Sequence, residues 1–198
     1  MTILLATKNN HKAEELSKLI GKYAEIQTLP EAFPDIEETG STLEENARLK
    51  AQAVYKEFKL PSVADDTGLE VSALGGAPGI YAARYAGNGA SYEDNYRKLL
   101  KELKDSSDRS ASFITTLCYI DEVGSEHFFR GEIKGIIAFE PRGKNGFGYD
   151  PVFIPVDGDG STFAEMSISD KNTLSHRARA IQQLKTYLKA KHGTENPV

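Results

Sequence analysis

The fold class of this chain is decided by residues 111–139, which read ASFITTLCYIDEVGSEHFFRGEIKGIIAF. Residues 111–120 and 126–139 are rich in the β-branched and aromatic side chains that favour strands, and the polar residues 121–125 between them predict a turn. We therefore expect a long antiparallel hairpin here. Because helical patterns lie on both sides of this hairpin, the sequence predicts a mixed α/β fold rather than a purely parallel, doubly wound sheet.

Helix signals surround the hairpin. At the start of the chain, residues 3–6 form a short apolar strand pattern that runs into Asn9 and Asn10, which are both good N-caps. Ser41, with Glu44 three residues later, is typical of a capping box. Apolar side chains at helical spacing predict four helices, in residues 13–23, 43–58, 92–103 and 178–188.

Two more strands are expected in residues 62–65 and 69–74, on either side of a polar turn at Asp66 and Thr67. The glycine-rich residues 75–79 are expected to break the chain after the second strand. Two adjacent acidic residues thus lie at the end of an apolar strand. Carboxylates in such a place are more indicative of a functional site than those of a solvated loop.

The composition limits the classes of function. The 198 residues include 24 Lys and Arg against 29 Asp and Glu, a formal charge of −5, which argues against coating DNA or an anionic membrane. The single cysteine, Cys118, excludes an internal disulfide. The apolar start is too short for a signal peptide or a membrane span. We expect a soluble, cytoplasmic protein with one domain over residues 1–191 and a polar C-terminal tail over residues 192–198.

The first candidate site is the turn at residues 7–12, where a predicted strand leads into a predicted helix. Backbone N–H groups at a helix N-terminus, with a lysine ammonium and a threonine hydroxyl, suit a polyphosphate. An ordinary capped turn with a solvated lysine would explain the same residues. No Walker A pattern occurs, so the turn is not a P-loop. Its residues are Thr7, Lys8, Asn9, Asn10, His11 and Lys12.

The second candidate site is acidic. Asp65 and Asp66 should point to opposite sides of the chain, so that one can face a site while a lysine or the backbone holds the other. A carboxylate of this pair could share Mg²⁺ with Glu37 or Glu38, because Mg²⁺ prefers a few oxygen ligands together with substrate phosphates. A solvated loop is the alternative explanation for Glu37 and Glu38.

The third candidate site combines the glycine-rich residues 143–151 with the polar residues 169–177. Glycines on both sides of Phe147 let the backbone and the ring approach a flat ligand, and an aromatic face can stack on any base. Arg177 could donate to a carbonyl group of that base, or it could form a salt bridge at the start of the last helix. His176 taken alone is more often a packed or capping histidine.

Together these segments closely resemble the inosine triphosphate pyrophosphatase family, whose members remove non-standard purine nucleoside triphosphates. The match follows the order of the chain over nearly its whole length, and seven motifs in order are far more specific than any one of them. The motifs are Thr7-x-Asn9-x-x-Lys12, Glu37-Glu38-Thr39-Gly40, Glu45-Asn46-Ala47, Ala64-Asp65-Asp66-Thr67-Gly68-Leu69, Leu74-Gly75-Gly76-Ala77-Pro78-Gly79, Gly146-Phe147-Gly148-Tyr149-Asp150-Pro151 and Ser175-His176-Arg177.

The resemblance implies Mg²⁺-dependent hydrolysis of inosine, deoxyinosine and xanthosine triphosphates to the monophosphate and pyrophosphate. It also implies a homodimer, and a mixed curved sheet with flanking helices in two lobes around a central substrate cleft. Asp66 would orient or deprotonate the attacking water and would bind the metal together with Glu37. The residues implied to bind the phosphates are Thr7, Asn9 and Lys12. The other implied nucleotide-site residues are Thr67, Phe147, Gly148, Tyr149, Asp150, Lys171, His176 and Arg177.

Some alternatives stay open at this point. Many relatives have glycine where Lys8 or His11 stands, so the phosphate turn is expected to be less open and more positively charged. Whether Glu37 or Glu38 binds metal is undecided, because the two are adjacent. A pyrophosphatase for other damaged or pyrimidine nucleotides is one alternative function, and a nucleotide sensor without hydrolysis is another. The retained acidic residues argue against the sensor. No nucleic acid or membrane partner is expected.

Overall fold

The computed structural model describes residues 1–21 and 23–192 and contains two compact units. Unit 1 comprises residues 1–66 and 115–131 and the chain from Arg177 on, and unit 2 comprises residues 67–114 and 132–176. Residues 193–198, most of the predicted tail, lie outside the described residues. Within the described ranges, no helix is both long and apolar enough to cross a membrane.

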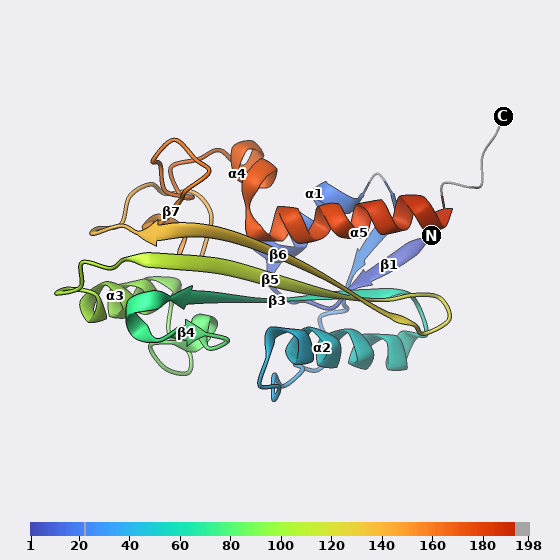
Figure 1. Cartoon of the computed structure of the whole chain (residues 1–198). Coiled ribbons are helices and arrows are strands. Elements are labelled where there is room, and N and C mark those ends of the chain that lie inside the picture. Colours follow the sequence, from blue (N-terminus) through green and yellow to red (C-terminus); the bar gives the residue numbers. More distant parts are fainter. Residues whose placement is uncertain (22, 193–198) are drawn as a thin grey trace. The chain divides into compact units, whose positions relative to one another are not determined.

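Strands and helices interleave along the chain (Figure 1). The strands are β1 Thr2–Leu5, β2 Glu25–Thr28, β3 Ser62–Val71, β4 Pro78–Gly79, β5 Ser110–Ile120, β6 Glu126–Ile137 and β7 Phe153–Pro155. The helices are α1 Asn10–Ile20, α2 Leu43–Phe58, α3 Tyr92–Glu102, α4 Ile168–Leu174 and α5 His176–His192. The four predicted helices and the predicted hairpin of β5 and β6 are confirmed.

The sheet is mixed, as the hairpin predicted. Its strand order is β2-β1-β3-β5-β6-β7, with β4 paired to β3. β1 pairs in parallel with both β2 and β3, whereas β4 pairs antiparallel with β3 and β7 antiparallel with β6. The predicted α/β class with helices flanking a mixed sheet is therefore confirmed.

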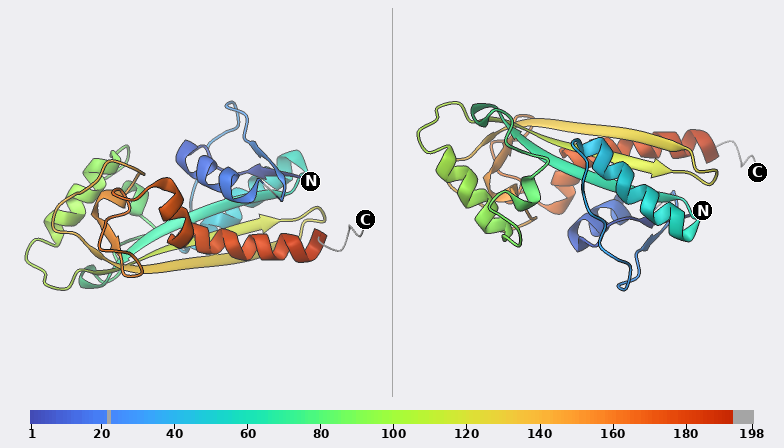
Figure 2. Two further views of the ribbon diagram at one scale, coloured as in Figure 1. Left: turned by 90° about the horizontal axis from the view of Figure 1, so that it is seen from above. Right: turned by 90° about the horizontal axis from the view of Figure 1, so that it is seen from below.

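Unit 1 buries β1 on both faces. Ile3 and Leu5 of β1 pack in a cluster with residues of α1 and α5, whereas Leu4 and Ala6 pack in another cluster with residues of α2. Figure 2 shows α1 and α5 in front in the view from above, and α2 in front in the view from below. Because alternate side chains of a strand point to opposite faces, a strand that is apolar throughout needs a helix on each side.

Unit 2 has one main core on one face of its strands. Leu69 and Val71 of β3 and Phe113 of β5 belong to a buried cluster that also contains Leu99 and Leu103 of α3 or its end. Glu70, between Leu69 and Val71, and Ser112, next to Phe113, are polar and at least partly exposed. This alternation of buried and polar residues is typical of strands that are covered on one side only.

One predicted turn is wrong. Asp66 and Thr67 do not interrupt the chain, because β3 runs as one strand from Ser62 to Val71. The acidic pair suggested a solvated turn, but both carboxylates are buried and are paired with cationic side chains of the neighbouring helices. Charged residues can occupy a buried strand when such partners are present.

The predicted N-cap lies one residue further along the chain, and the Glu45 carboxylate binds Ser41 rather than the backbone of the N-cap. Thr42, not Ser41, is the N-cap of α2, and its Oγ1 accepts a hydrogen bond of 3.1 Å from the Glu45 backbone N–H. The Glu45 carboxylate in turn accepts from the backbone N–H and the hydroxyl of Ser41. Both Ser41-x-x-Glu44 and Thr42-x-x-Glu45 fit the capping pattern, so the pattern alone could not choose between them.

Candidate active site

Asp65 and Asp66 point to opposite faces of β3, as predicted from their adjacency. Asp65 follows the side of Val63, which packs with α1 and α5, and Asp66 follows the side of Ala64, which packs with α2. Each carboxylate therefore meets its own set of side chains, and all of these belong to unit 1. β3 thus separates two charge clusters that differ in composition.

The Asp65 cluster is held by two cations. Asp65 Oδ2 lies 3.1 Å from Lys12 Nζ and accepts hydrogen bonds of 3.2 Å from Nε and Nη2 of Arg177. Arg177 Nη1 donates at 2.5 Å to Glu15 of α1. Burial alone would raise the pKa of Asp65, but Lys12 and Arg177 outweigh it and hold that pKa well below its usual range. Asp65 is therefore fixed as an anion that anchors two cations.

The same cluster affects its cations differently. Burial lowers the pKa of Lys12 despite the attraction of Asp65. For Arg177, by contrast, Asp65 and Glu15 outweigh burial and raise the pKa. The alternative explanation for Arg177, a salt bridge at the start of the last helix, is thus confirmed, and its side chain is 3% exposed.

The Asp66 cluster contains two carboxylates and one ammonium. Lys50 Nζ of α2 lies 3.1 Å from Asp66 Oδ1 and 2.6 Å from Glu38 Oε1. Asn46 Nδ2, one helical turn before Lys50, donates to Asp66 Oδ2 at 3.2 Å. Burial and the nearby Glu38 raise the pKa of Asp66, although Lys50 opposes them. Burial lowers the pKa of Lys50, but the neighbouring carboxylates of Asp66, Asp65 and Glu38 outweigh it and raise that pKa.

This geometry bears on the choice between Glu37 and Glu38. The Glu38 carboxylate shares the Lys50 ammonium with Asp66, while Glu37 is exposed. Two carboxylates around one ammonium leave one negative charge, which suits a divalent cation with oxygen ligands. Within the described ranges no group of three or more His, Cys, Asp or Glu side chains is gathered for a metal. A metal held by Glu38 and Asp66 would therefore need further oxygen atoms from substrate or water.

The predicted phosphate turn is an N-capped helix start. The Asn9 side chain accepts from the backbone N–H groups of His11 at 3.1 Å and Lys12 at 3.3 Å, and Thr7 Oγ1 accepts from Asn9 N–H at 3.1 Å. Lys8 pairs with Asp35 at 2.8 Å on the surface. Asn10 is the first residue of α1. The turn is therefore ordered largely by its own side chains, and Lys12 reaches from it to the Asp65 cluster.

In unit 2, Asp150 organises the glycine-rich loop. Its Oδ2 accepts from the backbone N–H of Phe147 at 2.8 Å and from Lys171 Nζ of α4 at 2.7 Å. The Lys171 ammonium lies 4.8 Å from the centre of the Phe147 ring. Gly146 has a φ of +75°, and a Cβ there would come within 2.0 Å of the Asp150 carboxylate. Only glycine fits this close approach.

The other predicted residues of unit 2 differ in burial. Tyr149 is buried in the core, and its hydroxyl donates to the Ala82 carbonyl at 2.8 Å. Its ring is therefore a core side chain rather than an exposed stacking surface. The His176 ring is 3% exposed and stacks on Phe113 at 4.5 Å between ring centres. Thr67 is half-buried on β3, and Gly148 adopts a φ of +64°.

Three contributors to these clusters have no site role predicted from the sequence: Glu15, Lys50 and Asn46, the last of which appears there only as part of a motif. Asn46 and Lys50 are buried and lie four residues apart on α2, next to its apolar positions Ala47 and Ala51. Polar side chains at helical spacing beside an apolar stripe were a signal that could have found them. Glu15 follows Lys12 by three residues and so lies on the same face of α1.

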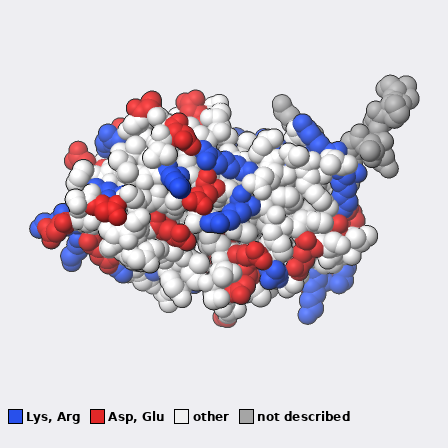
Figure 3. Space-filling view, viewed as in Figure 1, with Lys and Arg blue, Asp and Glu red and all other residues white. Residues whose placement is uncertain are grey.

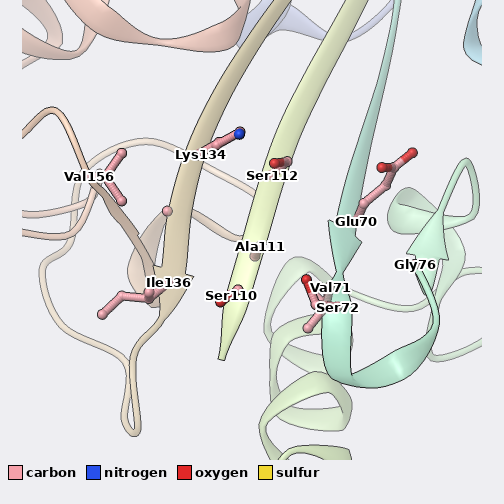
Figure 4. Close-up of a pocket in the computed structure, with 11 residues that line it drawn as sticks. Glu70, Val71, Ser72, Gly76, Ser110, Ala111, Ser112, Lys134, Ile136 and Val156 are labelled. Carbon is pink, nitrogen blue, oxygen red and sulfur yellow. The ribbon is translucent and has the colours of Figure 1, made fainter. Parts of the chain in front are cut away.

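The surface gives two further observations. Acidic and basic side chains are interspersed on the face shown in Figure 3, unlike the single-sign stripe of a typical nucleic-acid-binding face. A hollow of about 460 Å³ lies on the outer side of the unit 2 strands (Figure 4). Glu70, Ser112 and Lys134 are among its lining residues, and none of the predicted site residues is.

Known proteins resemble this chain over nearly its whole length. The sequence model of the Ham1 family matches residues 3–187. The dITP/XTP pyrophosphatase of Porphyromonas gingivalis is 49% identical over 189 residues, which cover 94% of this chain and 96% of that protein. The one from Christiangramia forsetii is 44% identical, over 95% of this chain and 99% of that protein.

Solved structures give the same result. The Ham1 protein of Staphylococcus aureus superposes with a TM-score of 0.87 at 39% identity, over 96% of this chain and 100% of that one. A HAM1 protein from Coxiella burnetii superposes with a TM-score of 0.86 at 43% identity, over 96% of this chain and 99% of that one. The motifs, the mixed sheet and these likenesses agree, and the chain belongs to the Ham1 family.

Proposed function

We propose that this protein is a Mg²⁺-dependent nucleoside triphosphate pyrophosphatase, which hydrolyses inosine, deoxyinosine and xanthosine triphosphates to the monophosphate and pyrophosphate. The observation that carries the proposal is the Asp66 cluster, in which two carboxylates, an amide and an ammonium meet on one face of β3. The names of the dITP/XTP pyrophosphatases that resemble this chain support the choice of substrate and reaction.

In this proposal Glu38 and Asp66 hold the metal, and Glu37 is the neighbouring alternative. Bound Mg²⁺ would neutralise charge on the phosphates and make an associated water more acidic. Asn46 and Lys50 orient the Asp66 carboxylate. Asp66 then positions the attacking water and takes its proton onto a carboxylate oxygen.

Charge on the departing pyrophosphate must also be stabilised. We assign this to Lys12, with Thr7 and Asn9 ordering the turn and Lys8, Asn10 and His11 adding polar groups around it. Asp65 fixes the Lys12 ammonium at 3.1 Å. A cation that is held in place before the reaction stabilises developing charge without first having to reorient.

For the base, unit 2 offers the Phe147 ring as a stacking surface, with Lys171 and Asp150 fixing its loop. We also assign four other residues to the nucleotide site: Gly148, Tyr149, Thr67 and His176. Arg177 is oriented by Asp65 and Glu15, and a guanidinium that donates to the 6-oxo group of hypoxanthine or xanthine would disfavour adenine. Adenine presents an amino donor at that position.

The proposal includes three finer points that rest on the resemblance. The active protein is a homodimer, residues 1–191 act as one nucleotide pyrophosphatase domain, and the protein functions in the cytoplasm. A sensor that binds nucleotide without hydrolysing it is the competing function. The sensor gains nothing from the negative charge that Glu38 and Asp66 place beside polyphosphate.

Asp66→Asn tests the proposed role. Asparagine preserves the size of the side chain but cannot accept the proton, so we expect kcat to fall by about 10²- to 10⁴-fold. Circular dichroism and thermal unfolding should show that the variant is folded, and calorimetry should show that it still binds inosine triphosphate. Unchanged pyrophosphate release would contradict the assignment, and a wild-type protein that binds without turnover would favour the sensor.

A further inference from the structure

The Phe147 ring lies between two glycines. Its neighbours Gly146 and Gly148 have φ values of +75° and +64°, in the region that glycine reaches most easily. Asp150 fixes the backbone N–H of Phe147 at 2.8 Å but does not fix the χ angles of its side chain. Among the rotamers that the backbone allows, the contacts of the ring itself therefore help to select its direction.

Tyr92 of α3 supplies one of these ring contacts. Its ring centre lies 5.9 Å from that of Phe147 with the planes tilted by 47°, within the range of favourable aromatic pairs. The two residues are 55 positions apart in sequence, and both belong to unit 2. The contact therefore links the glycine-rich loop to a helix.

The position of Tyr92 is itself well fixed. It is the first residue of α3 and follows the N-cap Ser91, which forms a reciprocal capping box with Asp94. Ser91 Oγ accepts from the Asp94 N–H at 3.1 Å, and the Asp94 carboxylate accepts from the Ser91 N–H at 2.9 Å. A capped first turn holds its residues more firmly than an open loop does. Tyr92 is 42% exposed, so packing in the core does not explain its place.

Tyr92 differs from the other ring contacts of Phe147. Lys171 lies 4.8 Å from the ring centre and donates to Asp150. The same Asp150 carboxylate accepts from the Phe147 backbone N–H, so both of these supports of Phe147 depend on Asp150. Tyr92 belongs to neither α4 nor the glycine-rich loop. Its ring therefore supports Phe147 independently of Asp150.

We propose that Tyr92 is a positioning residue, whose ring holds the Phe147 ring in the orientation that stacks on the purine base of the substrate. The proposal deepens the proposed function and rests on it for the identity of the ligand. Tyr92 acts through Phe147, so it governs substrate affinity rather than the chemical step. Loss of its ring should raise KM and leave kcat nearly unchanged.

The first test reports on the ring directly. The chain has no tryptophan, so Phe147→Trp introduces a single reporter that can be excited apart from the tyrosines. We expect Tyr92→Ala in this background to lower the anisotropy of the reporter and to raise its quenching by acrylamide. Tyr92→Phe keeps the ring and should behave as the parent.

Tyr81→Ala is the matched control, because Tyr81 is another exposed tyrosine of unit 2, 57% exposed, whose ring contacts the Arg84 guanidinium. It should leave the reporter unchanged. Thermal unfolding of every variant confirms that the fold persists. An anisotropy that does not respond to Tyr92→Ala would overturn the proposal.

The second test uses the natural Phe147. Tyr92→Ala should raise KM for inosine triphosphate about two- to tenfold with kcat within a factor of two, and Tyr92→Phe should restore KM. A reporter that becomes mobile while KM stays unchanged would overturn the link to the base. If the wild-type protein showed no turnover, the proposed function would fail, and the fluorescence comparison would still decide whether Tyr92 orders residue 147.

Discussion

At the scale of single residues, two adjacent carboxylates have different electrostatic roles because a strand separates their surroundings. Asp65 contacts Lys12 and Arg177. These cations hold its pKa far below the usual range although burial opposes them, so Asp65 remains an anion. Asp66 meets one ammonium and a second carboxylate, and its pKa is raised by burial and by Glu38. Asp65 is therefore suited to anchor cations, whereas the Asp66 cluster has negative charge left over for a metal.

Glu38→Gln and Glu37→Gln are a matched pair of substitutions that test which carboxylate binds Mg²⁺. Glu38 shares Lys50 with Asp66, whereas Glu37 is exposed. We expect Glu38→Gln to raise the Mg²⁺ concentration for half-maximal activity by roughly 10- to 100-fold, as for other groups that support a metal, and Glu37→Gln to change it less than twofold. The measurement is initial rate against Mg²⁺ concentration. A larger effect of Glu37→Gln than of Glu38→Gln would show that Glu37, not Glu38, is the metal ligand.

Part of this residue-scale pattern could be predicted from the sequence. The alternation of a strand predicts that Asp65 and Asp66 face apart and that a lysine could hold one of them, and both features are present. The identity of the partners could not be predicted, since Arg177 lies 112 residues from Asp65. Such pairs depend on tertiary packing, and no local pattern specifies them.

At the scale of elements, charged residues here stay within regular structure when helices supply counter-charges. β3 continues through Asp66 because α1 and α2 bring Lys12 and Lys50 to it. A helix also supplies a counter-charge to the turn between β5 and β6, where Lys191 of α5 lies 3.0 Å from Asp121. Asp121 is buried there and accepts from the backbone N–H groups of Val123 and Ser125.

Asp121→Asn tests the hairpin tip and gives a pH dependence with a definite sign. Burial alone would raise the pKa of Asp121, but Lys191 at 3.0 Å, the Ser125 N–H and His127 lower it well below its usual range. The charge therefore stabilises the fold above the unfolded-state pKa of about 4, and this contribution is lost as the pH falls toward the lowered folded-state value.

We expect Asp121→Asn to lower the free energy of unfolding at pH 7 by about 1.5–3 kcal/mol, the range for a hydrogen bond to a charged group. The difference from wild type should shrink as the pH falls below about 4. Urea unfolding at pH 7 and pH 3 measures both values. Glu122→Gln, which removes the exposed acidic partner of Lys191, is the control and should have the smaller effect at pH 7. A difference that grows toward low pH would show that the charge destabilises the fold.

Short elements set the limit of what the sequence predicts at this scale. The long hairpin and the four amphipathic helices have enough residues for their periodicity to be recognised. β2 and β7 contain four and three residues and α4 contains seven, too few for a period to emerge from its neighbours. Their existence depends on pairing with β1 and β6 or on the Ser167 cap of α4.

At the scale of the whole molecule, the order of the motifs carries more information than any single motif. The loop at Phe147, the acidic pair and the turn at Lys12 each have an ordinary structural explanation, but together and in order they predict the family, and the match to residues 3–187 confirms it. The charge clusters and the ring contacts of Phe147 could not be assembled from sequence alone, because their members come from distant segments. The first turn of α5, which begins at His176, brings Arg177 to Asp65, for example, and periodicity does not reveal this contact.

The most direct test of the central claim is a ³¹P NMR comparison of the products formed from inosine, xanthosine, guanosine and adenosine triphosphates, with Mg²⁺ and with a chelator. We predict pyrophosphate and the nucleoside monophosphate from the first two nucleotides, little product from the others, and no product once the metal is chelated. Release of orthophosphate, or product formation that persists with the chelator, would contradict a Mg²⁺-dependent pyrophosphatase centred on Asp66.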